Sequence, residues 1–576
     1  MLRRAISVRE RWELRSVESA SNCTSIESVL DSMNLKQKVG QMMMVGFPEP
    51  FHGELPPGVS ELLRDPGIGG VAVLARNART PESMRGLTTE LQRAARAAGA
   101  AAPLFIHGDS EGGIVMQVTE GTCTFPGAMA IGATGSTRYA YEAAYAMGCE
   151  ALAMGMNIVS APVADVNAEP DNPIIGVRSF GDDPDEVSRL AEAMIRGFRD
   201  AGVVCEAKHF PGHGRTRYDT HEDLPTIDFP GEDLARVELA PFAAAIKAGV
   251  PAIMTAHIAY PALGAPRGVP ATLSWDILTG LLRRKLLFDG IVITDCLEMR
   301  AIKDNYGPGQ AAVAAVNAGA DIVLMCHTLA LQKQAIDALM TAVEDGTIPR
   351  ARIDESVRRI LRAKATWLGD FERAQVGYSK GLEIVGCGEH RLIEQEIARA
   401  SITVVRDHRG ILPLAPSTSD AYAVVYPSTM PLLRAEDARD KVSVLGEAVR
   451  TRCPRTREVD VPLRPAAEDI RHAVGTALEA DVVIVVTSCK TPADEKAQGA
   501  LVKALMETGK PIVTLAIRNP YDLRAYPEVE TYLVTYGYRD CSIRAAAEVM
   551  FGEIRPQGRL PVAIPGLYPR GHGIRF

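Results

Sequence analysis

Residues 203–210 read VVCEAKHF, a short and mostly apolar run with a lysine and a histidine just before its last residue. A run of this length, without strict alternation of polar and apolar residues, is typical of a parallel strand buried on both faces. Similar runs recur along the first part of the chain, and amphipathic stretches with helical periodicity separate them. They span residues 39–47, 69–75, 103–109, 157–167, 252–258, 290–295 and 320–325. Eight strand–helix units in about 300 residues predict an α/β fold of the TIM-like (β/α)8 barrel type.

Polar side chains follow these predicted strands at their carboxyl ends, where (β/α)8 barrels carry their active sites. They are Asp109, Asp165, Asn167, Lys208, His209, His257 and Asp295. Any one Asp or Asn in such a place has an equally good explanation as a helix cap or a turn residue. The convergence of the whole set on one face of the barrel therefore predicts a functional site there.

A second, smaller α/β pattern begins near residue 390. Its predicted strands cover residues 400–407, 421–427, 480–488, 510–520 and 531–537. This pattern predicts an α/β/α sandwich of the doubly wound type, and the lack of a Gly-x-Gly-x-x-Gly turn gives no support for dinucleotide binding. We expect this sandwich to buttress the barrel. The expected division is a polar N-terminal tail over 1–30, the barrel over 31–370, a linker over 371–390 and the sandwich over 391–576.

The composition excludes several classes of function. A formal net charge of -8 argues against nucleic-acid partners, because such binding is driven by an excess of lysine and arginine. The chain has no run of about 18 apolar residues for a membrane span, and its charged N-terminus has no apolar core for a secretory signal. The ten cysteines form no Cys-x-x-Cys pair, which favours reduced thiols over a zinc site or a disulfide framework. We therefore expect a cytoplasmic protein without a nucleic-acid or membrane partner.

Residues 208–225, KHFPGHGRTRYDTHEDLP, concentrate three histidines, several cations and several carboxylates in one segment. Pro211, Gly212 and Gly214 interrupt any regular backbone pattern, so most of the segment is predicted to be a loop. Such a loop, directly after a barrel strand, brings chemically active side chains to the predicted site.

Several phrases, taken in their order and spacing, resemble glycoside hydrolase family 3. They are DSEGG at 109–113, NPIIGVRSFG at 172–181, KHFPGHG at 208–214, DTHEDLP at 219–225, MTAHIAYPAL at 254–263 and ITDCLEM at 293–299. Within the family the match is to the bacterial β-N-acetylglucosaminidase (NagZ-like) branch. The phrases SITVVRDHRGILPL, RNPYDLRAYPEV and FGEIRPQGRLPV extend the likeness to the C-terminal sandwich of two-domain members.

This resemblance implies a retaining exo-glycosidase that releases terminal β-linked N-acetylglucosamine through a covalent glycosyl-enzyme intermediate. Asp295 matches the nucleophile, a short carboxylate at a rigid strand end. Asp219 and His221 match an acid/base dyad, in which the aspartate orients an imidazole that titrates near neutral pH. The residues that match the sugar-binding set are Asp109, Arg178, Lys208 and His209. The resemblance further implies muropeptide recycling in the cytoplasm, no cofactor and no metal, and we expect a monomer or a weak homodimer.

The chain departs from the family pattern at a few positions. Many relatives carry arginine shortly after the Glu-Gly-Gly phrase, whereas Ile114 and Gln117 stand there in this chain. Arg215 and Arg217 lie in the predicted catalytic loop, where they would either attract an anionic aglycone or be solvated loop charges. Cys296, beside Asp295, is interpreted as a packing residue, and His213 as a residue that packs the loop.

Four other readings remain open at this stage. Phosphate in place of water as the acceptor would make the protein a β-N-acetylglucosaminide phosphorylase, since a histidine acid/base does not repel that anion. A β-glucosidase or β-xylosidase of the same family takes its acid/base carboxylate from elsewhere, so the Asp-Thr-His sequence argues against it. A metal-dependent hydrolase would need His209, His257 and Asp295 to meet at one ion. A non-catalytic sugar-binding protein on the same scaffold is the fourth.

Overall fold

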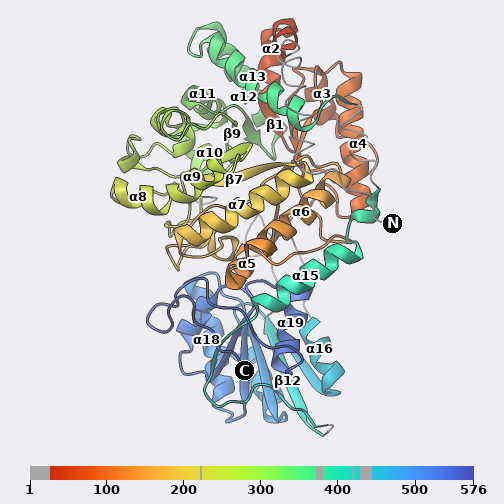
Figure 1. Ribbon diagram of the computed structural model, residues 1–576, viewed down its shortest axis with the longest axis vertical. Helices are drawn as coiled ribbons and strands as arrows, with labels where there is room; N and C mark the ends of the chain where they lie inside the picture. The colour runs from red at the N-terminus through yellow and green to blue at the C-terminus, as the bar shows by residue number, and fades with distance from the viewer. Residues whose placement is uncertain (1–25, 221–223, 372–380, 418, 428–443) are drawn as a thin grey trace.

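The computed structural model describes residues 26–576 except 221–223, 372–380, 418 and 428–443. Figure 1 shows two parts along the long axis of the molecule, a larger N-terminal part and a smaller C-terminal part drawn in blue. Helix α15 (Gly388–Ser401) runs along the boundary between them, and it packs against α5 and α6 of the first part and α19 of the second.

The first part is a barrel of parallel strands. Its strands are β1 (Met43–Val45), β2 (Gly70–Ala72), β3 (Phe105–Gly108), β6 (Ile158–Val159), β7 (Val204–Phe210), β8 (Ala252–Thr255), β9 (Ile291–Ile293) and β10 (Val323–Met325). They pair in the order β10-β1-β2-β3-β6-β7-β8-β9, and a bridge between Ile293 and Ile322 closes the circle. Every one of these strands lies inside a range predicted from the sequence, so the predicted (β/α)8 barrel is confirmed.

The barrel strands are buried on both faces, as their apolar runs require. Phe105 and Ile106 point to opposite faces of β3, and neither is accessible to solvent. The surrounding helices are α2 (Leu35–Gln41), α3 (Pro57–Arg64), α4 (Pro81–Ala97), α5 (Ala128–Thr134), α6 (Thr137–Ala153), α7 (Pro184–Ala201), α8 (Gly231–Val237), α9 (Leu239–Lys247), the π-helix Asp276–Lys285, α10 (Arg300–Tyr306), α11 (Pro308–Ala318), α12 (Leu329–Glu344) and α13 (Arg350–Trp367). A short hairpin of β4 (Ser110–Gly112) and β5 (Val115–Met116) follows β3. The hairpin was not predicted.

Helix α7 illustrates how local sequence sets the element boundaries. The side chain of Asp183 accepts hydrogen bonds from the backbone N–H groups of Asp185 and Glu186, and Pro184 occupies the first turn, where no N–H is needed. Gly202 ends the helix in the left-handed conformation, at φ 95°. The next strand, β7, starts two residues later and delivers Lys208 and His209 to the site.

The second part is a mixed sheet covered by helices. Its strands are β11 (Thr403–Asp407), β12 (Ala421–Pro427), β13 (Arg455–Val461), β14 (Val482–Thr487), β15 (Ile512–Ala516) and β16 (Thr531–Val534). They pair in the order β11-β16-β15-β14-β12-β13, and only the β11–β16 pair among them is antiparallel. Its helices, besides α15, are α16 (Val444–Arg452), α17 (Ala467–Leu478), α18 (Pro492–Met506) and α19 (Asp540–Met550). The predicted sandwich is confirmed, whereas strand β13 was missed.

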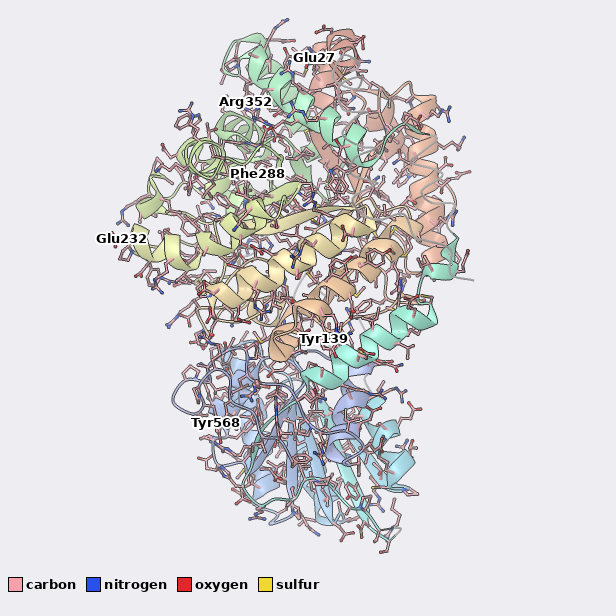
Figure 2. All side chains as sticks on the ribbon, in the orientation of Figure 1. Glu27, Tyr139, Glu232, Phe288, Arg352 and Tyr568 are labelled. Atoms are coloured by element: carbon pink, nitrogen blue, oxygen red, sulfur yellow. The ribbon has the colours of Figure 1, made fainter. Side chains whose placement is uncertain are left out.

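Loops of the barrel pack into the hydrophobic core of the sandwich. Ile114 and Ile174 belong to that core, and the Arg539 side chain reaches across to donate a hydrogen bond to the carbonyl of Gly113. Figure 2 shows Tyr139 of α6 at the boundary, where the neighbouring Arg138 forms an ion pair with Glu396 of α15 at 3.5 Å. The sandwich is therefore fastened to the loops that follow strands β3 and β6. No described helix is long and apolar enough to cross a membrane.

Candidate active site

A cavity of about 910 Å³ opens at the carboxyl ends of the barrel strands. Among the residues that line it are Asp109, Arg178, Lys208, His209, His213 and Asp295. Its volume suits a small-molecule ligand such as one or two sugar units. All five of the predicted nucleophile and sugar-binding residues are thus brought together in one cavity.

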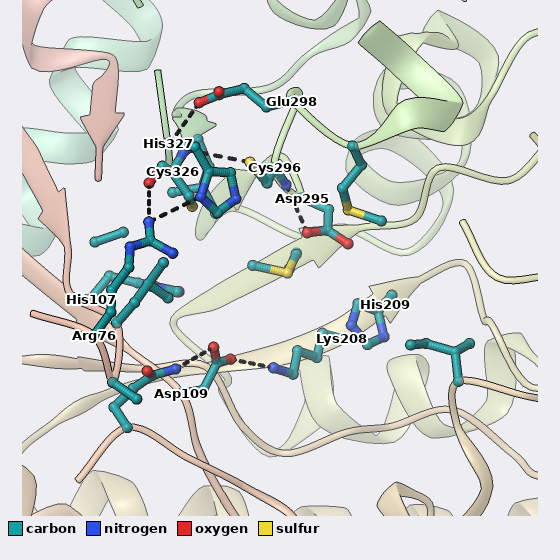
Figure 3. Close-up of a pocket in the computed structure, with 18 of the residues that line it drawn as sticks. Arg76, His107, Asp109, Lys208, His209, Asp295, Cys296, Glu298, Cys326 and His327 are labelled. Atoms are coloured by element: carbon teal, nitrogen blue, oxygen red, sulfur yellow. Dashed lines mark hydrogen bonds and ion pairs between the residues drawn. The ribbon is translucent and has the colours of Figure 1, made fainter. Parts of the chain in front are cut away.

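A largely buried cluster of two cations and two carboxylates lies at one wall, to which it contributes Asp109, Arg178 and Lys208. The Lys208 Nζ atom lies 2.8 Å from Asp109 Oδ1 and 2.6 Å from Glu111 Oε1. Arg178 donates from Nε and Nη2 to the two Glu111 oxygens at 2.9 and 2.8 Å, a bidentate pair. Figure 3 shows Lys208 pointing at Asp109 from across the cavity floor. The four charges balance, which makes their burial tolerable.

The electrostatics of the cluster keep all four groups ionised. Burial alone would raise the pKa of Asp109, but Lys208 and other nearby cations lower it to about 2. Burial would likewise raise the pKa of Glu111, and Arg178 and Lys208 hold it below its usual value. The pKa of Lys208 is raised, because Asp109 and Glu111 outweigh the effect of burial. The wall thus presents fixed charged acceptors and donors, which suits the recognition of several hydroxyl groups.

His209 is oriented by Asp165, the polar residue that follows β6. Its Nδ1 atom lies 2.8 Å from Asp165 Oδ2, and its backbone N–H donates to the same carboxylate. The backbone N–H of His213 also donates to Asp165, at 2.7 Å. Asp165 is therefore a positioning residue for two histidines of the cavity wall. This geometry leaves the Nε2 atom of His209 facing Arg178, at 3.5 Å.

Asp295 follows β9 and is half-buried in the opposite wall of the cavity. The backbone N–H of Cys296 donates to Asp295 Oδ1 at 2.7 Å. The Cys296 carbonyl lies 3.1 Å from His257 Nε2, while Nδ1 of the same ring lies 2.8 Å from the Thr272 hydroxyl. His257 thus supports the segment that holds Asp295, and the two side chains are not arranged as ligands of one metal ion. Among the described residues, no group of three or more His, Cys, Asp and Glu side chains is arranged to hold a metal ion.

The predicted acid/base loop is described up to Thr220, and His221 lies outside the described residues. Thr220 lines the cavity, and its hydroxyl lies 3.1 Å from His213 Nε2. Asp219 is half-buried, and its Oδ2 atom lies 3.8 Å from Lys490 Nζ of the sandwich. Of the dyad, the structure therefore places the aspartate beside the cavity rim and at the boundary with the second domain.

The first residues of this loop are tightly packed. A Cβ atom on Gly214 would lie 1.6 Å from the carbonyl oxygen of Val166, so only glycine permits this approach of the two backbones. His213 is 2% exposed, consistent with the predicted packing role, although it also lines the cavity. Glycine in this loop therefore serves close packing at the point where the loop leaves β7.

The two loop arginines are engaged away from the cavity. The Nε atom of Arg215 lies 2.9 Å from Glu238, and its guanidinium stacks on Phe229. Arg217 pairs with Glu169 at 2.8 Å. Neither is among the described residues that line the cavity. The alternative in which they attract an anionic aglycone therefore has no geometric support.

The departures from the family pattern and the remaining polar residues also have structural explanations. Ile114 is buried in the core shared with the sandwich, where a cation would be costly. Gln117 instead faces the cavity and donates to Asp109 Oδ2 at 2.9 Å. Asn167 turns away from the cavity, and its Nδ2 atom donates to the hydroxyl of Tyr521 at 2.9 Å.

Sequence reasoning missed several residues of the site. Glu111 is the most important: it does not line the cavity but pairs with Lys208 and Arg178, which do. Its signal was present in the DSEGG phrase, where it follows Asp109 at the spacing of one strand face. The others lie on loops after β2 and β10, namely Arg76, Cys326 and His327. Arg76 donates to the Cys326 carbonyl at 2.8 Å. No pattern in the sequence indicated that these two loops meet.

Comparisons with known proteins agree with this arrangement. The model of the glycosyl hydrolase family 3 N terminal domain matches residues 34–363, and that of the family 3 C-terminal domain matches residues 373–568. The chain is 32% identical to beta-hexosaminidase A of Pseudoalteromonas piscicida, over 92% of this chain and 97% of that protein. It is 27% identical to a beta-N-acetylglucosaminidase/beta-glucosidase of Cellulomonas fimi, over 93% of this chain and 95% of that protein.

A solved structure is similar over the same extent. It is a glycoside hydrolase family 3 beta-N-acetylglucosaminidase from Paenibacillus sp. str. FPU-7, with 37% identity and a TM-score of 0.84. The alignment covers 92% of this chain and 99% of that one, so both parts of the molecule are matched.

Proposed function

Since the chain belongs to glycoside hydrolase family 3, we propose that it is a retaining exo-β-N-acetylglucosaminidase. The observation that carries this proposal is that Asp295 lines the same cavity as Asp109, Lys208 and Arg178, whose cations are held by Asp109 and Glu111. One wall can hold a sugar by its hydroxyl groups while a carboxylate from the other wall reaches its anomeric carbon. The activities by which these relatives are named support the N-acetylglucosaminide as the substrate class.

In this proposal Asp109 accepts hydrogen bonds from sugar hydroxyls, and Lys208 and Arg178 donate to them. Asp295 attacks the anomeric carbon, so that the bond to the leaving oxygen breaks as a glycosyl ester forms. His221, held by Asp219, donates the proton that the leaving oxygen needs and then removes a proton from the attacking water. Hydrolysis of the ester returns Asp295 as a carboxylate and releases the sugar with its original anomeric configuration.

The test measures release of an aryl leaving group from β-N-acetylglucosaminide and β-glucoside by the parent protein and by Asp295→Ala. Loss of a covalent nucleophile is expected to lower kcat by about 10³-fold or more. Asp337→Ala is the matched control, because Asp337 is exposed on α12. We expect the control to keep its activity and the parent to prefer the acetamido sugar.

Two further readouts separate the mechanism from the activity. Nuclear magnetic resonance of the first product should detect the β-anomer. Azide added to Asp295→Ala should restore turnover and give the α-glycosyl azide, because the small anion enters where the carboxylate stood. Release of the α-anomer by the parent, or activity that survives loss of Asp295, would contradict the proposal.

Phosphate as the acceptor is a second candidate, and Arg76 favours it. This arginine lines the cavity, and none of the described carboxylates lies within ion-pair distance of it. Its Nη2 atom is held by the Cys326 carbonyl and by His327 Nδ1, at 2.8 and 3.0 Å. The same assay with added phosphate decides the question, because a phosphorylase yields N-acetylglucosamine 1-phosphate.

A further inference from the structure

Two cysteines lie side by side at the carboxyl ends of the neighbouring strands β9 and β10. Cys296 follows Asp295, Cys326 follows β10, and both line the cavity. The backbone N–H of Cys326 donates to Cys296 Sγ at 3.4 Å, so the Cys296 sulfur lies against residue Cys326. The two segments are also joined by the Leu297 N–H, which donates to the Leu324 carbonyl at 3.0 Å. Figure 3 shows the pair together with Arg76 and His327.

The surroundings of Cys296 Sγ are donors. The imidazole of His327 lines the same cavity, and its Nδ1 atom lies 3.0 Å from Arg76 Nη2. Because a guanidinium can only donate, His327 Nδ1 accepts from Arg76, and the ring of a neutral His327 carries its proton on Nε2. Cys296 therefore accepts from the backbone N–H of Cys326 in a cavity that also holds an imidazole donor and a guanidinium, surroundings that stabilise a thiolate.

The two thiols are consequently unequal. Hydrogen bonds from Cys326 and His327 lower the pKa of Cys296 to about 6, although burial opposes them. The pKa of Cys326 is raised well above its usual value, by the same hydrogen bond and by burial. Other buried cysteines, such as Cys123 and Cys205, have a pKa raised by burial. Among these four, only Cys296 is thus set up as a nucleophile near neutral pH.

We propose that Cys296 and Cys326 form an oxidisable thiol pair that peroxides convert to a disulfide, and that this disulfide inactivates the catalytic site. The Cys296 thiolate attacks one peroxide oxygen, the O–O bond breaks, and the sulfur becomes a sulfenic acid while hydroxide leaves. The Cys326 thiol then attacks the Cys296 sulfur, and the sulfenic hydroxyl leaves as water with the Cys326 proton, while the hydroxide from the first step takes up the proton that Cys296 released when it ionised. The pair loses two electrons and two protons, and one peroxide becomes two waters.

The disulfide would act on Asp295 through the backbone of Cys296. That residue supplies the N–H that holds Asp295 Oδ1 and the carbonyl that faces His257. Both cysteines are free in the structure, and a disulfide requires a sulfur–sulfur bond of about 2.05 Å, so the Cys296 segment must move toward Cys326. The nucleophile then loses its alignment. This loss of activity rests on the proposed function, whereas formation of the disulfide does not.

The test treats the full-length protein with hydrogen peroxide and maps the products by peptide mass spectrometry. We expect a Cys296–Cys326 cross-linked peptide that dithiothreitol removes. In Cys326→Ser the resolving thiol is absent, so Cys296 should stop as a sulfenic acid that dimedone traps. Cys296→Ser should give neither product. Cys149→Ser, at a half-buried cysteine on α6, is the control and should still form the cross-link.

Activity is followed in the same samples. We expect peroxide to lower the parent's activity by at least about tenfold, reversibly, and to leave Cys296→Ser at its own untreated rate. Absence of the cross-link in folded parent protein would overturn the proposal, as would a cross-link that leaves the parent's activity intact. A cross-link in a protein that never shows glycosidase activity would uphold the thiol pair and refute the proposed function.

Discussion

Two aspartates that follow parallel strands, the half-buried Asp109 in the barrel and the buried Asp522 in the sandwich, meet opposite electrostatic surroundings. Asp109 follows β3 of the barrel, and the Lys208 ammonium 2.8 Å away helps to lower its pKa to about 2 against the effect of burial. Asp522 follows β15 of the sandwich and is 1% exposed, and burial raises its pKa to about 7. The same residue type after the same kind of strand is thus a fixed anion in one domain and close to half-protonated at neutral pH in the other.

This difference indicates what each set of strand ends does. In the barrel the charged residues are paired with one another and open to a cavity. In the sandwich the polar and charged residues face the barrel loops. Asn519 packs against Gly176, where an added Cβ atom would lie 2.8 Å from Asn519 Oδ1, and Arg524 pairs with Asp171 at 2.8 Å. A parallel sheet gathers polar side chains at its carboxyl edge in both cases. Balanced charge and an open cavity distinguish a binding site from an interface.

The sharpest test of this comparison is the pair Asp109→Asn and Asp522→Asn. Asp109→Asn leaves Lys208 with one buried counter-charge fewer and removes an acceptor for the sugar, so kcat/KM should fall by about 100-fold or more. Asp522→Asn should change kcat/KM by less than about twofold, because that side chain does not line the cavity. If both variants fold and lose comparable activity, the contrast between a binding role for Asp109 and a structural role for Asp522 is wrong.

The dependence of stability on pH should differ in the same sense. Between about pH 4 and pH 7 the unfolded chain releases the Asp522 proton while the folded protein keeps it, so this residue makes the folded state less stable as pH rises. Asp522→Asn removes this titration. The free energy of unfolding of the variant minus that of the parent should therefore rise by up to about 4 kcal/mol between pH 4 and pH 7. Thermal unfolding of both proteins across this window measures the difference. A free energy of unfolding of the variant that falls relative to that of the parent as pH rises would contradict the assigned protonation of Asp522.

Arg539→Met tests whether the sandwich acts mainly through stability. Arg539 is fully buried and donates to the Gly113 carbonyl across the boundary, and its loss should cost about 1–3 kcal/mol. We expect a Tm lower by several degrees and kcat/KM within about threefold of the parent at lower temperature. Arg555→Met, at an exposed arginine of the same domain, is the control. A selective rise in KM without a change in Tm would assign the sandwich a direct role in binding.

The smallest effect is expected where the sandwich touches the catalytic loop. Lys490→Met removes the cation 3.8 Å from Asp219, and a pair of this kind contributes at most about 1 kcal/mol. If Asp219 serves the acid step, the loss of rate should be up to about fivefold on an alkyl glycoside and smaller on an activated aryl glycoside, which needs less protonation. Lys496→Met, at an exposed lysine on α18, is the control. Equal losses on both substrates would separate Lys490 from the acid step.

The parts of this fold that could be predicted are those in which one residue pattern has one structural meaning. Continuous apolar runs located all eight barrel strands, because parallel strands covered on both faces have no polar face to show. Strand β13, RTREVDV, escaped because it lies at a sheet edge and alternates exposed and buried residues over a short, arginine-rich segment. The hairpin β4–β5 escaped because its strands are only three and two residues long.

The site divides in a similar way. Asp109, Lys208, His209 and Asp295 could be placed because they terminate strands, whose ends must meet in a barrel. Glu111 and Arg76 could not, since the ion pairs of Glu111 with Lys208 and Arg178 and the approach of Arg76 to the cavity depend on loop conformations and on contacts distant in sequence. The catalytic roles of Asp295, Asp219 and His221 and the division of the chain at 371–390 stay predictions, and residues 221–223 and 372–380 lie outside the described residues.

The central claim is that Asp295 is the carboxylate that bonds to the sugar. It can be tested with 2-acetamido-2-deoxy-5-fluoro-β-glucosyl fluoride, because the ring fluorine slows both steps while the fluoride leaving group keeps the first step faster than the second. Intact-mass spectrometry followed by peptide mapping should detect one fluorosugar bound to the peptide that contains Asp295, and Asp295→Ala should remain unlabelled. An active enzyme that stays unlabelled, or a label on any other residue, would contradict the account.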